Sequence, residues 1–371
     1  MKEKRIIPRI TSIILMLCLL FGMLVGCGST KAETTVSDTT KDAGKMKTFT
    51  DSLGREVEVP ENLTSVVASG STAFIYLYAI APESIMAVNT ELTDAANEYL
   101  QEELDELPVI GSFFGNHDLN YEEIASLGPQ LVIDIGENKP SMESDLEDIT
   151  NKTGVTAIHI DAYYDNMDET FEMLGELFGK EEEADALAKF CSNSLKLSQD
   201  AVDTAQQKNE KKSVLYCTQE DGLNVLAKDS YHSEVIDMLA DNLAVVTNPS
   251  SKGTGNQEDI EQLLNWDPQV IIFSPDSYYD YAWEDESWQE LTAIKNGTYY
   301  ETPSGPYGWM GSPPASNRVI GMLWMADLLY PEYTDFDLQD MTIEYYKLFY
   351  HYDLSDEEYE SLVANSIGKR S

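Results

Sequence analysis

A turn of small, hydroxylated residues joins an apolar strand pattern to an apolar helix pattern early in the chain. The strand pattern is Val66 to Ala68, the turn is Ser69-Gly70-Ser71-Thr72, and the helix pattern begins at Ala73. The first N–H groups of a helix have no partner within the helix, so they can bind an anion or a polar ligand. The hydroxyls can also act as simple helix caps, and both roles can hold at once. Ser71 and Thr72 are therefore candidate ligand-binding residues.

Aromatic side chains gather in loops that also carry glycine. Phe113 and Phe114 precede Gly115, and Tyr278 follows an apolar strand pattern that ends at Phe273. Open α/β sheets place ligands at the C-terminal ends of their strands, and aromatic rings stack on flat apolar faces. A single ring of this kind is more often a core side chain, but the grouping in loops favours a cleft. The rings proposed to stack on a ligand are Phe113, Phe114, Tyr278, Tyr307 and Trp309.

Arginine is scarce, and one arginine falls beside the aromatic loops. Of the five arginines, Arg318 stands at the start of the last core helix pattern. A guanidinium there can hold an anionic group with two hydrogen bonds or form a structural ion pair, and both roles stay open. The four histidines are scattered, which argues against a site for bare Zn²⁺ or Mn²⁺. His117, Tyr216 and Tyr278 remain candidate ligands of chelated iron, and His117 also of haem iron.

Two ten-residue stretches share one pattern and predict how these residues are positioned. Ile124–Ile133 and Leu263–Ile272 align without a gap, with a Pro-Gln pair in each and acidic residues before each. The pattern is a short amphipathic helix, a proline that ends it and a buried strand. Because one copy lies in each half of the folded body, the sequence predicts two α/β lobes of similar design.

Length, charge and motifs restrict the function. The 371 residues suit two domains, and the net charge of −42 argues against binding nucleic acid or an anionic lipid surface. No Gly-x-Ser-x-Gly, His-Glu-x-x-His or phosphate-cradling motif occurs, so we expect a binding protein without a cofactor and not an enzyme. The cysteines match no zinc pattern, and pairing of Cys191 with Cys217 stays open.

The N-terminus has the pattern of an export signal. Basic residues precede an apolar stretch that is too short for a convincing membrane span. The ending Leu24-Val25-Gly26-Cys27 resembles a bacterial lipobox, which implies lipidation of Cys27 and a protein held at the outer face of the cytoplasmic membrane. The predicted organisation is a signal (1–27), a flexible tether (28–47), a first lobe (48–166), an inter-lobe helical segment broken at Gly179 (167–208), and a second lobe with an acidic helical tail (209–371).

The chain resembles the substrate-binding proteins of ABC importers, in the class that captures iron–siderophore complexes, haem or cobalamin. The resemblance rests on an ordered set of motifs behind the lipobox: Thr50–Pro60, Glu122–Ile133, Leu263–Ile272, Leu291–Tyr300, Trp309, and Asn317 to Pro331. It implies two Rossmann-like α/β lobes joined by a single long helix, with a ligand cleft between the lobes. It also implies a monomer that delivers its ligand to a membrane permease driven by an ATPase.

The resemblance further implies ligand and docking residues. Phe113 lies where relatives carry a cleft aromatic, which favours a metal chelate as ligand. An oxyanion such as molybdate or tungstate is the alternative, since the Ser69–Thr72 turn, Ser312 and the Asn317-Arg318 pair would suit it. Family members usually dock through one acidic residue on each lobe. Glu143 fits the first position, and Glu234 or Asp237 fits the second.

Overall fold

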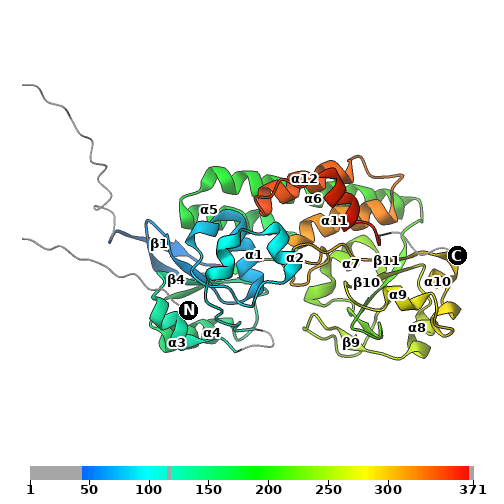
Figure 1. Ribbon diagram of the computed structural model, residues 1–371, viewed down its shortest axis with the longest axis horizontal. Helices are drawn as coiled ribbons and strands as arrows, with labels where there is room; N and C mark the ends of the chain where they lie inside the picture. The colour runs from blue at the N-terminus through cyan, green and yellow to red at the C-terminus, as the bar shows by residue number, and fades with distance from the viewer. Residues whose placement is uncertain (1–43, 115–117, 367–371) are drawn as a thin grey trace, which may run out of the picture. The chain divides into compact units, whose positions relative to one another are not determined.

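The computed structural model describes residues 44–114 and 118–366 (Figure 1). The export signal with Cys27, most of the predicted tether and His117 lie outside the described residues. None of the helices in the described part of the chain is long and apolar enough to cross a bilayer.

The first lobe is built on a parallel sheet behind an N-terminal hairpin. The hairpin strands pair antiparallel across Leu53-Gly54, as the sequence predicts, and Gly54 takes a φ of +75° that favours glycine. The sheet order is β3-β4-β5, and every residue of β3 and β4 is buried. The elements are β1 (Met46–Thr50), β2 (Glu56–Pro60), β3 (Val66–Ala68), α1 (Ser71–Ile80), α2 (Asp94–Tyr99), α3 (Tyr121–Leu127), β4 (Leu131–Gly136), α4 (Met142–Thr153) and β5 (Ala157–Asp161).

The second lobe has a mixed sheet with parallel central strands. Its order is β11-β10-β6-β7-β9, with β8 also paired to β6, and β10 runs parallel to both of its neighbours. The elements are β6 (Ser213–Thr218), β7 (Asn224–Val225), α7 (Glu234–Leu239), β8 (Asp241–Asn242), β9 (Asn256–Gln257), α8 (Ile260–Trp266), β10 (Val270–Phe273), α9 (Tyr279–Ala282), α10 (Thr292–Asn296) and β11 (Tyr299–Glu301).

The repeated stretches form the same unit in each lobe. One copy is α3 followed by β4 and the other is α8 followed by β10, and both strands lie between two parallel neighbours. The glutamine of each Pro-Gln pair has the same task. Gln130 accepts a hydrogen bond from the Ser65 N–H, and Gln269 accepts one from the Ser213 N–H, just ahead of the neighbouring strand. The predicted pair of similar α/β lobes is confirmed.

The predicted inter-lobe segment consists of two helices, and the second of them is long. α5 (Met167–Phe178) ends at Gly179, whose φ of +66° closes the helix, and α6 (Glu181–Gln207) follows. The two helices pack closely, because a Cβ on Gly175 would lie 2.5 Å from the Ala184 Cβ. α6 contacts α5 on the first-lobe side and α7 in the second lobe. α6 is therefore the long helix that joins the two lobes.

The expectation of a C-terminal acidic tail is wrong in one respect. The segment is helical, with α12 (Leu338–Phe349) and α13 (Asp356–Leu362) following α11 (Asn317–Leu329). However, α12 packs against α1, α6 and α11, and Tyr345, Tyr346 and Phe349 are fully buried. The acidic residues of α12 lie on its exposed face and its aromatic residues on its buried face, so this helix belongs to the core.

The two cysteines of the described chain are unpaired. Cys191 on α6 and Cys217 on β6 are both buried and free. Burial raises the pKa of both thiols, so they remain protonated at neutral pH.

Candidate functional site

The N-terminus of α1 is open, as a ligand site requires. Its N-cap is Gly70, no side chain caps it, and no acidic residue lies in its first turn. Ser71 and Thr72 are the first two helical residues and are only half-buried. Their hydroxyls therefore do not serve as the N-cap, and the first N–H groups of α1 point outward with the positive end of the helix dipole.

Several segments converge on this helix start. A Cβ on Gly70 would lie 3.6 Å from the Ser112 hydroxyl. A Cβ on Gly136, at the end of β4, would lie 3.7 Å from Cγ2 of Thr72 and 3.6 Å from the hydroxyl of Tyr231. Tyr231 comes from the second lobe, so Gly136 marks the place where the two lobes meet beside α1.

Arg318 is held against the same tyrosine. Its guanidinium lies over the Tyr231 ring, 4.7 Å from the centroid, and Nη2 donates to the Tyr231 hydroxyl at 3.3 Å. Nη1 pairs with Glu234 at 2.6 Å. The Tyr231 hydroxyl in turn donates to the Ala162 carbonyl of the first lobe at 2.7 Å. We call Ser71, Thr72, Gly136, Tyr231 and Arg318 the inter-lobe cluster.

Two buried nitrogen atoms in or next to this cluster have no hydrogen-bond partner among the described residues. Arg318 is 1% exposed, yet its Nε has no hydrogen-bond partner among the described residues. The buried Nδ1 of His232, next to Tyr231, is also unpaired. A buried donor without a partner is costly, and a bound ligand can supply the missing acceptor.

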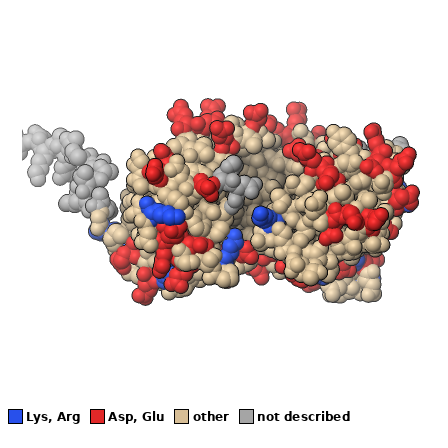
Figure 2. Space-filling model, turned by 90° about the horizontal axis from the view of Figure 1, so that it is seen from below, with Lys and Arg blue, Asp and Glu red and all other residues tan. Residues whose placement is uncertain are grey.

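Cationic side chains act on the residues of the cluster although the chain is strongly acidic. Burial lowers the pKa of His232 to about 4, and the charges of Arg318 and Lys139 act in the same direction. Burial raises the pKa of Tyr231 to about 12, so its hydroxyl remains a donor. Figure 2 shows acidic side chains over much of one face, with Lys or Arg side chains near its middle, beside a hollow.

The two phenylalanines form a separate, partly exposed aromatic feature. Phe113 and Phe114 meet edge to face at 4.9 Å, and Lys139 Nζ lies 3.9 Å from the Phe114 ring centroid. The Phe113 N–H donates to the Ser69 carbonyl at 2.7 Å, which attaches this loop to the turn before α1. The structure therefore brings Phe113 and Phe114 near the inter-lobe cluster.

Other predicted aromatic ligands are occupied elsewhere. Trp309 is fully buried and its indole N–H donates to Tyr346, so its placement in the cleft is wrong. Tyr216 is 3% exposed and its hydroxyl is bonded to Thr302, so it is a core residue in this structure. Tyr307 packs against Tyr350. Tyr278 stacks with second-lobe rings and donates to Asp285, away from the inter-lobe cluster.

The predicted docking acids differ in their availability. Glu143 is exposed in the first turn of α4. Glu234 is bound to Arg318, and Asp237 accepts hydrogen bonds from Asp229, Ser233 and Asn242. The carboxylates of Glu234 and Asp237 thus have partners within the protein, although both side chains are partly exposed.

Sequence reasoning missed Tyr231, the residue that links the lobes at the cluster. It opens the short 3-10 helix Tyr231–Ser233, which a Ser230–Ser233 capping box precedes. The third position of this box is serine and not the glutamate or glutamine of the usual motif, so the sequence carries only a weak signal for the turn. The direction of the tyrosine hydroxyl depends on Ala162 in the other lobe, which no local pattern reveals.

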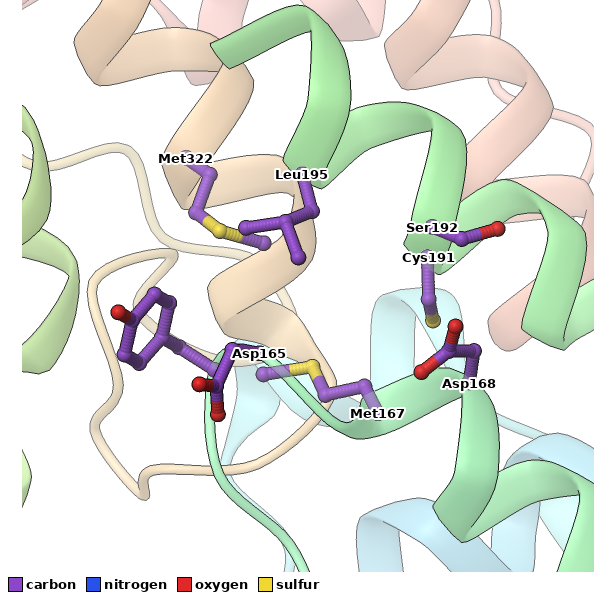
Figure 3. A pocket seen from close by; sticks show the side chains of 8 residues that line it. Asp165, Met167, Asp168, Cys191, Ser192, Leu195 and Met322 are labelled. Carbon is purple, nitrogen blue, oxygen red and sulfur yellow. The ribbon is translucent and has the colours of Figure 1, made fainter. Parts of the chain in front are cut away.

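A pocket lies along α6, and none of the residues of the inter-lobe cluster lines it. It is lined by Tyr164, Asp165, Met167, Asp168, Cys191, Ser192, Leu195 and Met322 (Figure 3). The Cys191 thiol faces Asp168 there, and burial with this neighbouring charge keeps its pKa high. None of the predicted ligand-binding residues lines this pocket.

The two-lobe fold with a polar cluster at the lobe boundary is that of a solute receptor. A family model for periplasmic binding proteins matches residues 66–306, which is more than half of the chain. The chain belongs to this family, whose members are solute-binding proteins of ABC transporters and not enzymes.

Individual relatives agree with this assignment. The molybdate-binding protein MolA of Haemophilus influenzae is 25% identical over 81% of this chain and 90% of its own length. An uncharacterised ABC transporter substrate-binding lipoprotein, YvrC of Bacillus subtilis, is 23% identical over 84% of this chain and 94% of its own length. A solute-binding protein from Sulfurospirillum deleyianum superposes with a TM-score of 0.78 at 26% identity, covering 85% of this chain and 99% of its own.

Proposed function

We propose that this solute receptor captures a small oxyanion, of the molybdate or tungstate kind, for an ABC importer. The observation that carries the proposal is the uncapped start of α1 beside a buried arginine with an unpaired Nε. Helix N–H groups, hydroxyls and a guanidinium are the donors that bind oxyanions in proteins. A relative that is named a molybdate-binding protein supports the same ligand class.

A metal chelate is the second candidate. Phe113 and Phe114 are partly exposed and lie at the edge of the inter-lobe cluster, where their rings could stack on a flat chelate. The structure supports a chelate ligand less than the sequence does, because Trp309 and Tyr216 belong to the core. A large flat ligand would then contact only one pair of rings.

The remaining parts of the proposal concern attachment and delivery. Cys27 would carry the lipid that holds the receptor at the outer face of the membrane, and a relative named as a lipoprotein supports this. Glu143 would be the first-lobe contact to the permease, because it is exposed at a helix start. For the second lobe, Glu234 and Asp237 stay the two candidates, and either would contact the permease while keeping its partners within the protein.

Calorimetric titration of the purified full chain tests the ligand class. We expect saturable binding of molybdate or tungstate and none of ferric siderophore, haem or cobalamin. Thr72→Val should weaken oxyanion binding about tenfold, because it removes one hydroxyl donor next to a charged ligand. Calorimetry is preferable to tryptophan fluorescence, since Trp309 is not at the cluster.

Thr64→Val makes the same change at an exposed residue and should leave binding unchanged. Binding of a chelate without an oxyanion, weakened by Phe113→Ala, would transfer the site to the second candidate. Absence of oxyanion binding would overturn the proposal.

A further inference from the structure

Four polar side chains form a continuous chain across the first-lobe sheet. The Ser69 hydroxyl donates to Asp134, His159 Nδ1 lies 2.6 Å from Asp134 Oδ2, and His159 Nε2 lies 2.9 Å from Asp161 Oδ1. Asp134 on β4 and His159 on β5 are directly opposite in the parallel register, so their side chains meet on one face. His159 is fully buried, and Ser69 and Asp134 are nearly so.

The hydrogen bonds place the His159 ring between two carboxylates. Both nitrogens of His159 face carboxylate oxygens, and an ionised carboxylate can only accept. With both carboxylates ionised, each ring nitrogen donates a hydrogen bond, and the ring between them is then an imidazolium. The nearby Arg55 is committed to Asp51, with Nη2 at 2.6 Å, so His159 is the cation that faces Asp134.

This charge balance lies directly behind the proposed anion site. Ser69 precedes the N-cap of α1, and its hydroxyl is held by Asp134 while its carbonyl holds Phe113. An unneutralised carboxylate at Asp134 would be one side chain away from the helix start. In a buried setting its field is weakly screened and would repel an anion there.

We propose that His159 is a positioning residue of the oxyanion site, which it serves without touching the ligand. Its positive charge offsets that of the buried Asp134, whereas Asp161 on the other side of the ring is partly exposed and is screened by solvent. The His159–Asp134 pair holds Ser69, so the start of α1 keeps its positive potential. The inference rests on the proposed function. It adds a buried residue that lowers the repulsion between Asp134 and an anion bound at the start of α1.

A charge-rescue experiment separates this role from simple packing. We expect His159→Gln to weaken molybdate binding at least about tenfold, because Asp134 is left unneutralised behind the helix start. Asp134→Asn should bind about as tightly as the wild type. The double variant His159→Gln/Asp134→Asn should recover most of the lost affinity, since no buried charge then faces the site.

A purely structural role predicts the opposite for the double variant. If it binds as weakly as His159→Gln or more weakly, the inference is wrong. His351→Gln, the same change at an exposed histidine, is the control and should bind like the wild type. Circular dichroism confirms that each variant is folded before its affinity is compared.

Two further results distinguish the two proposals. Wild-type binding with no loss in His159→Gln would overturn this inference alone, whereas no oxyanion binding by the wild type would overturn the proposed function and this inference with it. Nitrogen NMR of the ligand-free protein checks the charge directly. Both ring nitrogens of His159 should be protonated at neutral pH, and a neutral ring would contradict the inference.

Discussion

Arg318→Met should lower the free energy of unfolding by about 3–5 kcal/mol and abolish oxyanion binding. The substitution leaves Glu234 half-buried without the guanidinium that lies 2.6 Å away. It also removes the donor to the Tyr231 hydroxyl and the charge above the Tyr231 ring. Urea unfolding and calorimetric titration of the same preparation measure the two effects.

The loss of stability should depend on pH. Burial already raises the pKa of Glu234, and Arg318 acts against that rise. Without Arg318 the folded-state pKa rises further above the unfolded value. Such a group loses its stabilising contribution as pH rises through the folded pKa, so the deficit should be larger near about pH 7 than near about pH 4.

Two comparisons isolate the buried pair. Arg318→Met/Glu234→Leu replaces both charges by apolar groups and should recover most of the stability while binding stays lost. Lys196→Met breaks a pair with Asp200 on the exposed side of α6 and should cost less than about 1 kcal/mol. Equal costs for Arg318→Met and Lys196→Met would contradict the importance of burial.

Phe349→Ala should destabilise the protein by about 3–5 kcal/mol, as expected for a large ring deleted from a packed core. Phe349 is fully buried, stacks on Tyr345 at 4.4 Å, and meets Phe171 and Phe190 edge to face. The contacts join α12 to α5 and α6, so the loss should appear as a lower midpoint of a single urea transition.

Glu357→Ala on the exposed side of α13 is the matched change in the same C-terminal segment. It should alter the free energy of unfolding by less than about 0.5 kcal/mol. An unchanged midpoint for Phe349→Ala would mean that α12 is not part of the core and that the C-terminal segment is the tail its composition suggests.

The contrast between these regions explains what the sequence could predict. The lobes were predictable because α3–β4 and α8–β10 repeat one local pattern, and the periodicity of buried positions is a property of each segment. The hairpin was predictable from Leu53-Gly54 for the same reason. These features depend on residues that are neighbours in the chain.

The site depended on residues that are distant in the chain. The turn at Ser71 and Thr72 and the scarcity of arginine led to three members of the inter-lobe cluster. Tyr231 was missed because its hydroxyl is directed by Ala162. Trp309 was misplaced because a glycine-rich loop does not reveal on which side its ring lies, and here a partner on α12 holds the ring inside.

The long helix α6 between the lobes also limits how this receptor can signal to a permease that a ligand is bound. α6 has 27 residues and is therefore about 40 Å long. If it bends by about ten degrees at its middle, one end moves by only about 3.5 Å relative to the other half of the helix. A permease that sensed the closure of the two lobes would have only a small displacement to detect. A permease would then recognise the bound state from the positions of side chains at the lobe boundary. Recognition and release would depend on short-range contacts there.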